Sequence, residues 1–261
     1  MLTLEDFKTA LESLELENKP AIAHASLKSF GPIQGGAETV LEALLGQVSG
    51  LMMPAFTYKA MIFPEVGPPN NGLTYGKQRD LNLMAEPFRY NMPVDTMIGT
   101  LAETLRQYPR AMRTAHPILS FTGLRLDAAL MTQTVYDPFA PIDWLADHDG
   151  WVLLLGVDHT VNTSIHYAEK MARRHQFVRW ALIPKRIVEC PGYPGCSDGF
   201  EDIRLDLEDI THRVELGDSF IEAIPVNLLL QVVESRIKRN PLALLCRRDE
   251  CERCDAVRNI V

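Results

Sequence analysis

The chain has no long apolar segment. A helix that crosses a bilayer needs about 20 consecutive apolar residues, and no stretch of this sequence approaches that length. The first residues, MLTLEDFKTALESLELENK, are acidic and amphipathic, which is unlike a secretory leader. We therefore expect a cytoplasmic protein that does not use a membrane as its partner.

Several common signatures of nucleotide-binding and hydrolytic proteins are also missing. There is no Walker lysine motif and no G-x-G-x-x-G, so neither a P-loop nor a dinucleotide-binding fold is indicated. Ser120 lacks the flanking glycines of a nucleophile elbow, which argues against a serine hydrolase. Basic residues are outnumbered, and the formal net charge of -8 argues against nucleic acid as the main partner.

Cysteine is sparse but unevenly placed. Cys190 and Cys196 lie in CPGYPGC, and Cys246, Cys251 and Cys254 lie in CRRDECERC. In a cytosolic chain such close spacing suggests a metal more readily than disulfides. Only the last two cysteines have the Cys-x-x-Cys separation, so two readings stay open: a structural zinc site, or free or redox-active thiols. No metal is assigned to the catalytic centre.

What the sequence does contain is an alternation of apolar runs and turn residues. In its first part we expect a helix over 3–17, a strand over 21–26, a helix over 37–48 and a strand over 50–58. Residues 59–93 are rich in Pro, Gly and Asn and show little periodicity, which is typical of a functional or mobile loop.

The second part of the chain continues the same alternation. We expect a helix over 94–109, a strand over 113–123, a strand over 151–155 that leads into a helix, a strand or hairpin over 179–190, and a short strand over 242–246. The prediction is a single α/β domain over residues 1–261, in which helices flank a central mixed sheet and 59–93 form a long loop insertion.

The stretch WVLLLGVDHTVNTSIHYAEKMARR contains the clearest candidate site. Its apolar run predicts a buried strand, and the helix after the polar turn can be capped by Asn162 or Thr163. His166 and Glu169 are three residues apart, so they share one face of that helix. Such a pair suits general acid–base catalysis, although a surface polar pair has the same spacing. No ligand spacing supports zinc at Asp158 and His159.

A second candidate site is the Gly35-Gly36 pair directly before a helix. Backbone N–H groups and the helix dipole can bind phosphate there, and Ser26, Lys28 and Ser29 are nearby donors. The alternative is a plain turn at a helix start. Further along, His116 and Ser120 either face a ligand or occupy half-buried strand positions.

Five stretches in chain order resemble one family, the aminoglycoside 3-N-acetyltransferases and their relatives, which take an acyl group from coenzyme A. They are HASLKSFGPIQGGAETVLEALL, LMMPAFTY, MPVDTMIGTLAETLRQYPRAMRTAHPILSFTGL, VLLLGVDHTVNTSIHYAEKMA and DGFEDI. The first is similar to the family's coenzyme-binding signature, and the fourth to its Asn-Thr and His-x-x-Glu signature. The resemblance implies an antibiotic-acetyltransferase type α/β fold, distinct from the small GNAT fold.

The resemblance also implies an activity: transfer of acetyl from acetyl-CoA to the 3-amino group of an aminoglycoside, without an acyl-enzyme. His166 would be the general base, and Glu169, or less readily Asp198, would orient it. The residues implied in binding coenzyme A are Ser26, Leu27, Lys28, Ser29, Ile33, Gly35, Gly36, His116, Ser120 and Phe121. Those expected to bind the acceptor are Tyr75, Asp95, Asn162 and Thr163, with Glu65 and Glu201 as further carboxylates for its ammonium groups.

One motif departs from the family. The chain has DPFAPIDWL over 137–145 where the family usually has Pro-Phe-Gly-x-x-Ser-Pro, so Ala140 replaces a glycine and the Ser-Pro is missing. Two alternatives therefore stay open: an acyl-CoA N-acyltransferase that acts on a different amine metabolite, and a coenzyme-A-binding relative without antibiotic activity.

Overall fold

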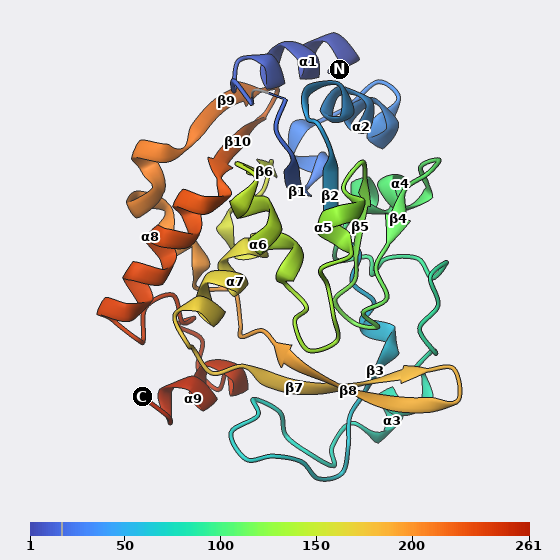
Figure 1. Cartoon of the computed structure of the whole chain (residues 1–261), viewed down its shortest axis with the longest axis vertical. Helices are drawn as coiled ribbons and strands as arrows, with labels where there is room; N and C mark the ends of the chain where they lie inside the picture. Colours follow the sequence, from blue (N-terminus) through green and yellow to red (C-terminus); the bar gives the residue numbers. More distant parts are fainter. Residues whose placement is uncertain (17) are drawn as a thin grey trace.

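The computed structural model describes residues 1–16 and 18–261 as a mixed α/β structure (Figure 1). Its principal sheet has seven strands in the order β4-β5-β2-β1-β6-β10-β9. These strands are β1 (Ala21–Ala25), β2 (Leu51–Pro54), β4 (Met112–Arg113), β5 (Phe121–Leu124), β6 (Trp151–Leu155), β9 (His212–Leu216) and β10 (Ser219–Pro225). The α-helices are α1 (Leu4–Glu12), α2 (Gly36–Gln47), α3 (Arg79–Leu83), α4 (Thr100–Gln107), α5 (Asp127–Leu130), α6 (Ala140–Asp147), α7 (Ser164–Met171), α8 (Val226–Arg239) and α9 (Glu252–Arg258). The 3-10 segments are η1 (Leu27–Phe30), η2 (Tyr58–Ala60), η3 (His159–Val161) and η4 (Phe200–Ile210).

The centre of this sheet is parallel and its edges are antiparallel. β1 pairs in parallel with β2 and with β6, so that Ala21 lies opposite Leu51 on one side and Trp151 on the other. The pairs β2–β5, β4–β5, β6–β10 and β9–β10 are antiparallel. The predicted fold class, helices around a central mixed sheet, is confirmed.

The apolar run of β6 is explained by burial on both faces of the sheet. Successive side chains of a strand point to opposite faces, and here Val152 and Leu154 pack into one core while Leu153 and Leu155 pack into another. Residues of α5, α6, α7 and α8 complete the first core, and residues of α1, α2 and α4 complete the second. A strand covered on both faces has no position left for a solvent-exposed polar residue.

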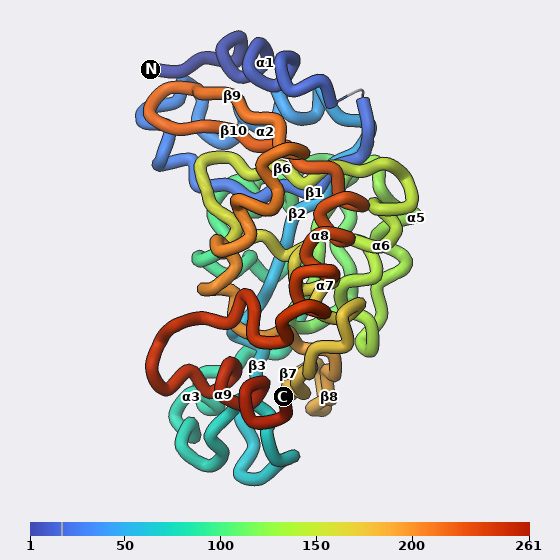
Figure 2. The backbone as a smooth tube through the Cα atoms, turned by 90° about the vertical axis from the view of Figure 1, so that its left-hand side faces the viewer, coloured from blue at the N-terminus to red at the C-terminus, as the bar shows by residue number. Residues whose placement is uncertain are grey.

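A smaller sheet lies at the other end of the molecule from α1 and the N-terminus (Figure 1, Figure 2). It has the order β3-β7-β8, formed by β3 (Met61–Ile62), β7 (Phe177–Ile183) and β8 (Arg186–Tyr193). The strand or hairpin predicted over 179–190 is therefore a hairpin. The expected long loop over 59–93 contributes β3 and α3, so it is less irregular than its composition indicates.

Four predicted elements are shorter than their sequence patterns suggest. The strand expected over 50–58 is β2, which ends at Pro54. The helix expected over 3–17 is α1, which ends at Glu12; the last predicted residue, 17, lies outside the described residues. The helix expected over 94–109 begins only at Thr100, because Gly99 precedes it with φ of 96°. The strand expected over 113–123 is divided into β4 and β5. Between them the backbone turns, and the His116 ring stabilises the turn because its Nδ1 accepts hydrogen bonds from the N–H groups of Ile118 and Leu119.

One predicted strand was wrong. Residues 242–246 do not form a strand. Leu244 has a positive φ of 62°, and the carbonyls of Pro241 and Ala243 accept hydrogen bonds from the Arg174 guanidinium, at 2.9 and 2.6 Å. The apolar side chains of this segment are nevertheless buried in the first core, which is why the run resembles a strand in the sequence.

None of the described helices combines the length and the apolar character needed to cross a bilayer.

Candidate active site

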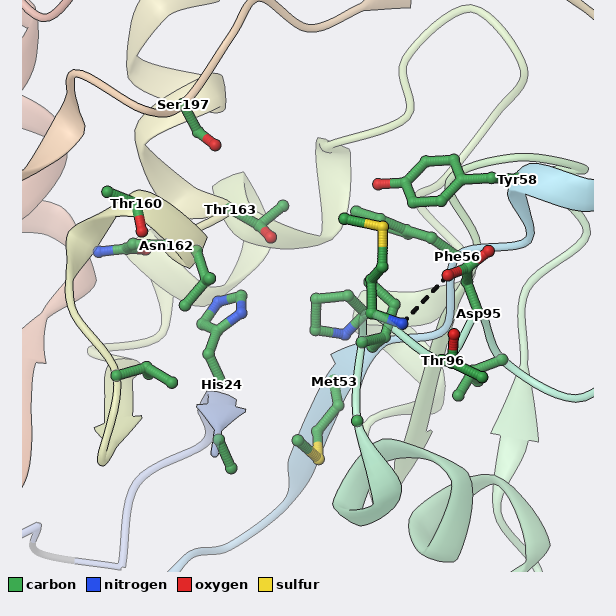
Figure 3. A pocket seen from close by; sticks show the side chains of 18 of the residues that line it. His24, Met53, Phe56, Tyr58, Asp95, Thr96, Thr160, Asn162, Thr163 and Ser197 are labelled. Atoms are coloured by element: carbon green, nitrogen blue, oxygen red, sulfur yellow. Dashed lines mark hydrogen bonds between the residues drawn. The ribbon is translucent and has the colours of Figure 1, made fainter. Parts of the chain in front are cut away.

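A cavity of about 1070 Å³ opens at the carboxyl ends of the parallel strands β1, β2 and β6. Its wall includes residues that follow these strands, the segment from Pro93 to Thr100, and residues near the end of β8. Figure 3 shows Thr160 and Asn162 on one side and Asp95 and Thr96 on the other. Open α/β sheets bind their ligands at this position, outside the carboxyl ends of the strands.

The predicted His–Glu pair forms on the first turns of α7. His166 lines the cavity, and its Nδ1 lies 2.7 Å from Oε2 of Glu169. Glu169 does not line the cavity: it is only 1% exposed, and its Oε1 accepts a hydrogen bond of 2.8 Å from Arg174. The carboxylate is therefore held between a histidine at the cavity and an arginine behind it.

The electrostatics of this buried triad favour an ionised carboxylate. Burial alone raises the pKa of the Glu169 carboxyl, but the hydrogen bond from His166 and the charges of His166 and Arg174 outweigh it, so the pKa lies below its usual value. An ionised carboxylate accepts but cannot donate. It therefore fixes the proton of His166 on Nδ1 and leaves Nε2 as the nitrogen that can accept a proton from a ligand.

Aromatic rings hold the imidazole in place. The Phe139 ring stacks on it with centroids 5.9 Å apart, and the Phe200 ring packs against it edge-on at 4.8 Å. Phe139 comes directly before α6 and Phe200 begins η4. Three segments distant in sequence thus fix the orientation of His166.

The turn between β6 and α7 positions the residues predicted for the acceptor. The Asn162 side-chain oxygen accepts the Ser164 N–H at 3.1 Å directly before α7, whose N-cap Thr163 makes no side-chain cap bond. Asn162 and Thr163 are buried and line the cavity. His159 is also buried, and among the described residues no group of three potential metal ligands includes it or Asp158.

The predicted coenzyme residues fall into two groups. Ser26, Leu27 and Lys28 line the cavity at the end of β1. Ser29 turns away, with its hydroxyl donating to the Ser26 carbonyl at 2.6 Å. The remaining N-terminal residues, Ile33, Gly35 and Gly36, lie outside the lining of the cavity, at and just before the start of α2.

Gly35 and Gly36 adopt backbone conformations that favour glycine. Gly35 and Gly36 have φ of 76° and 63°, a region that L side chains rarely adopt. Gly35 is the N-cap of α2 and offers no side-chain cap. The Gly36 N–H donates to the Ile33 carbonyl at 3.3 Å, and an anion would meet the N–H groups that follow it. Their role in phosphate binding stays a prediction.

His116, Ser120 and Phe121 occupy internal positions. All three are buried, and none lines the cavity. The Ser120 hydroxyl donates to the Ala55 carbonyl at 2.7 Å and accepts from Arg113 at 3.1 Å. These bonds give Ser120 a structural role, and its contacts offer no support for its predicted place in the coenzyme site.

Of the predicted acidic residues, Asp95 and Asp198 line the cavity. Asp198 does not contact His166 but pairs with Arg248 at 2.8 Å, so Glu169 is the carboxylate that orients the imidazole. Glu65 pairs with Arg79 at 2.7 Å and Glu201 accepts the backbone N–H of His159 at 2.9 Å. Neither of these two lines the cavity.

Tyr75 lies in the segment before α3, away from the lining of the cavity. Its hydroxyl accepts from Asn71 at 2.8 Å and donates to the Pro68 carbonyl at 3.0 Å. Its ring packs against Trp180 of β7. These contacts hold Tyr75 outside the cavity, so they give no support to its predicted contact with the acceptor.

The sequence reasoning missed His24. This residue of β1 lines the cavity near Met53 (Figure 3), and its Nε2 is buried without a hydrogen-bond partner. Burial lowers the pKa of His24 to about 3, so the ring is neutral. The available signal was a single polar residue inside the apolar strand AIAHA.

Fold and site together define a class of protein. A cavity at the carboxyl ends of parallel strands, with a buried carboxylate that fixes the tautomer of a histidine in its wall, is an arrangement typical of α/β enzymes. The family model described as aminoglycoside 3-N-acetyltransferase matches residues 22–238. The chain belongs to this family, as the sequence predicted.

Individual relatives match part or most of the chain. Aminoglycoside N(3)-acetyltransferase IX of Micromonospora chalcea is 33% identical over 172 residues, which is 61% of this chain and 59% of the relative. Aminoglycoside N(3)-acetyltransferase III of Serratia marcescens is 28% identical over 233 residues, 78% of this chain and 84% of the relative. The chain therefore spans less than two thirds of the Micromonospora enzyme.

Solved structures extend the likeness in fold to the whole chain. The apoenzyme of aminoglycoside acetyltransferase AAC(3)-IVa matches with a TM-score of 0.80 at 24% identity, over 100% of this chain and 98% of that one. A histidine-to-alanine mutant of the same enzyme in complex with a gentamicin matches at 0.78 and 23%, with the same coverage. AAC-IIIb in a binary complex with CoASH matches at 0.71 and 19%, over 91% of this chain and 96% of that one. These neighbours confirm the antibiotic-acetyltransferase fold and exclude the small GNAT fold.

Proposed function

We propose that the protein is an acetyl-CoA-dependent N-acetyltransferase that acetylates the 3-amino group of aminoglycosides by direct transfer, with His166 as general base. The observation that carries this proposal is the hydrogen bond between His166 and the buried Glu169, which directs the basic nitrogen of the ring to the cavity. Family membership supplies the reaction type, since relatives are named aminoglycoside N(3)-acetyltransferases.

The cavity is at the large end of the range of small-molecule sites. Ligand sites for small molecules commonly measure about 300–1,000 Å³, and this one measures about 1070 Å³. Ser26, Leu27 and Lys28 would meet the coenzyme, with the Lys28 ammonium group directed to its phosphates. A related structure holds CoASH, which supports a coenzyme on this fold.

The acceptor would be held by carboxylates and amide groups. Asp95 and Asp198 offer negative charge to the ammonium groups of an aminoglycoside, and Asn162 and Thr163 offer hydrogen bonds to its hydroxyls. Asp95 is already fixed in direction, because its Oδ1 accepts the Met97 N–H at 3.1 Å (Figure 3). One related structure contains a gentamicin, which supports this class of acceptor.

The chemical step follows from the geometry of the histidine. His166 Nε2 takes a proton from the protonated acceptor amine, and the freed lone pair attacks the thioester carbonyl. A C–N bond forms and the C–S bond breaks. The second proton that the attacking nitrogen loses passes to the departing thiolate, and His166 returns its own proton to solvent. Glu169 stabilises the positive charge that develops on the imidazole, and Arg174 keeps that carboxylate in place. No cysteine lines the cavity among the described residues, so an acyl-cysteine has no part in this reaction.

The test is an acceptor panel with the purified chain. Acetyl-CoA is incubated with gentamicin, apramycin and non-aminoglycoside amines such as linear polyamines, and products are followed by mass spectrometry. We expect aminoglycosides to gain one acetyl group, which NMR places on the 3-amino nitrogen. The control is acetyl-CoA without acceptor, which measures hydrolysis.

Two results would contradict the proposal. Turnover with polyamines but with no aminoglycoside would show an N-acyltransferase of metabolism. Binding of coenzyme A by calorimetry without turnover on any amine would show a coenzyme-binding relative that lacks the activity.

A further inference from the structure

The cysteines are not used by the proposed reaction, yet four of the five converge. Sγ atoms of Cys196, Cys246, Cys251 and Cys254 all lie within 4.8 Å of one another, and all four residues are buried. All are free thiols, as is Cys190 of β8, which is not in the group. The Cys-x-x-Cys spacing of Cys251 and Cys254 accounts for only two of these thiols. The fold brings the other two to the same place.

The four thiols come from two segments that are distant in sequence. Cys196 lies in the loop between β8 and η4, and Cys246 follows α8. Cys251 directly precedes α9 and Cys254 lies in its first turn. Figures 1 and 2 show α9 and the C-terminus folded back beside the second sheet, at the base of β7. The tertiary fold thus completes a set of four that the sequence alone left undecided.

The separation of the sulfurs fits a single ion. A tetrahedral zinc with Zn–S bonds of about 2.3 Å places its four sulfurs about 3.8 Å apart, which lies within the upper limit of 4.8 Å found here. An iron–sulfur cluster lies between its ligands and holds them further apart than one ion does. Four thiolates are also the ligand set that zinc occupies in structural sites of the Cys₄ type.

The surroundings supply what a thiolate site needs. Four thiolates around one divalent ion carry a net negative charge, and Arg248 donates toward the sulfurs of Cys196 and Cys251 at 3.4 and 3.9 Å. The backbone N–H of Cys246 donates to the sulfur of Cys254 at 3.4 Å. Such outer hydrogen bonds orient metal ligands and offset their charge.

We propose that Cys196, Cys246, Cys251 and Cys254 bind one zinc ion in a structural site. Four thiolates fill the tetrahedron and leave no open position for water or substrate, so this zinc does not take part in catalysis.

The site fastens two parts of the cavity wall to each other. Gly195 and Ser197 flank Cys196 and line the cavity, as does Arg253, between Cys251 and Cys254. The Arg253 guanidinium donates to the Gly195 carbonyl at 2.8 Å, parallel to the proposed link through the metal. The zinc therefore holds the C-terminal helix against the loop that carries Asp198.

The first measurement is the metal content of the full chain, purified without chelator from zinc-supplemented cells. We expect about one zinc per chain by inductively coupled plasma mass spectrometry. A Cys254→Ser variant is expected to lose at least about nine tenths of it, because three thiolates and a hydroxyl bind zinc far more weakly. The matched control is Cys190→Ser: Cys190 is equally buried but lies outside the group, so this variant should keep its zinc.

The second measurement reads the ligand set directly and does not depend on how well a variant folds. Cobalt(II) replaces zinc in the wild-type chain, and four thiolate ligands give intense sulfur-to-cobalt charge-transfer bands and the visible spectrum of a tetrahedral ion. A strong chelator should remove these bands and lower the melting temperature of the wild type by several degrees.

The proposal does not depend on acetyltransferase activity, since each readout is the metal or the stability. It is overturned by wild-type protein with less than about a tenth of an equivalent of zinc, by iron in its place, or by disulfides among the four cysteines. Equal zinc in the wild type and the Cys254→Ser variant would also overturn it.

Discussion

At the scale of single residues, the two nitrogens of His166 have different environments. Nδ1 is committed to Glu169 at 2.7 Å, while the ring itself borders the cavity. Glu169 is in turn committed to Arg174, whose guanidinium also binds the Pro241 and Ala243 carbonyls. This chain of contacts gives the histidine one orientation and one tautomer, which is what a positioned base requires.

Replacement of His166 by alanine is expected to lower kcat by about 10²–10⁴-fold, the usual contribution of a positioned acid–base group. The affinity for acetyl-CoA, measured by calorimetry, should change little because the ring contacts the reacting amine. Glu169→Gln should lower kcat less, since an amide oxygen still accepts from Nδ1, but should also lower stability because it leaves Arg174 buried without a counter-charge.

The matched control is His148→Ala. His148 is an exposed histidine at the end of α6 that stacks on Trp144, and it does not line the cavity. Its removal should leave kcat unchanged. Near-normal turnover of His166→Ala on an aminoglycoside that the wild type acetylates would refute the role of the base, and a Glu169→Gln enzyme slower than His166→Ala would point to the carboxylate instead.

At the scale of elements, the turn after β6 determines how closely η1 approaches the sheet. Gly156 has φ of 64°, and a Cβ atom on it would lie 1.9 Å from the Ser29 hydroxyl and 2.9 Å from the Phe30 ring. The glycine thus lets η1 approach the end of β6 closely. Since Ser26 to Lys28 line the cavity at this point, the same contact positions the predicted coenzyme residues.

Gly156→Ala is therefore expected to destabilise the protein by about 1–3 kcal/mol, from backbone strain and displacement of Ser29. Gly46→Ala provides the comparison. Gly46 lies exposed in α2, and its added Cβ would meet nothing within 4 Å, so this change should stabilise by about 0.5–1 kcal/mol. Urea denaturation of both variants measures the two effects; equal free energies of unfolding for them would show that the turn tolerates a side chain.

At the scale of the whole molecule, the fold buries several histidines in their neutral form. Burial lowers the pKa of His24 to about 3 and that of His116 to about 4. The pKa of His159 is also lowered, first by burial. In the unfolded chain each returns to the ordinary histidine pKa of about 6.5, so between these values the unfolded state binds more protons than the folded state.

The free energy of unfolding is therefore expected to fall as the pH falls below about 6.5. His24 and His116 each contribute a loss of about 2 kcal/mol between pH 7.5 and pH 5, and His159 adds to the loss in the same direction. Chemical denaturation at pH 7.5 and at pH 5 measures the total loss in the free energy of unfolding. A His116→Asn variant isolates the contribution of His116. Its side-chain Oδ1 lies close to the position of the imidazole Nδ1 and can accept the N–H groups of Ile118 and Leu119, but it does not titrate. Its loss between the two pH values should be smaller than that of the wild type, and an equal loss would show that His116 is already protonated in the folded state.

The elements that could be predicted from the sequence are those whose signals lie in neighbouring residues. The apolar run of 151–155, the glycine after it and the polar turn predicted β6 and the start of α7, because the apolar pattern and the Asn162–Ser164 turn depend on neighbouring residues. His166 and Glu169 were paired by helical spacing alone. The family motifs, which run in order, indicated the fold class and the family that the comparisons confirm.

Other segments could not be predicted because their conformation depends on contacts with residues distant in sequence. Residues 242–246 resemble a strand, but the Ala243 carbonyl, like that of the preceding Pro241, binds Arg174, and the apolar side chains of the segment pack into the core. The prediction of one domain over 1–261 stays a prediction, since the small second sheet is built from two segments more than 100 residues apart.

The tertiary structure alone decided which polar groups meet. It buried Ser120 outside the lining of the cavity and placed His24, one polar residue in an apolar strand, at the cavity. It also closed Cys196 onto the three cysteines near the C-terminus. The spacing of residues along the chain predicts which side chains share a face of one helix or one strand. Contacts across tens of residues depend on how the cores on both faces of the sheet pack, and hydrophobic burial does not specify them residue by residue.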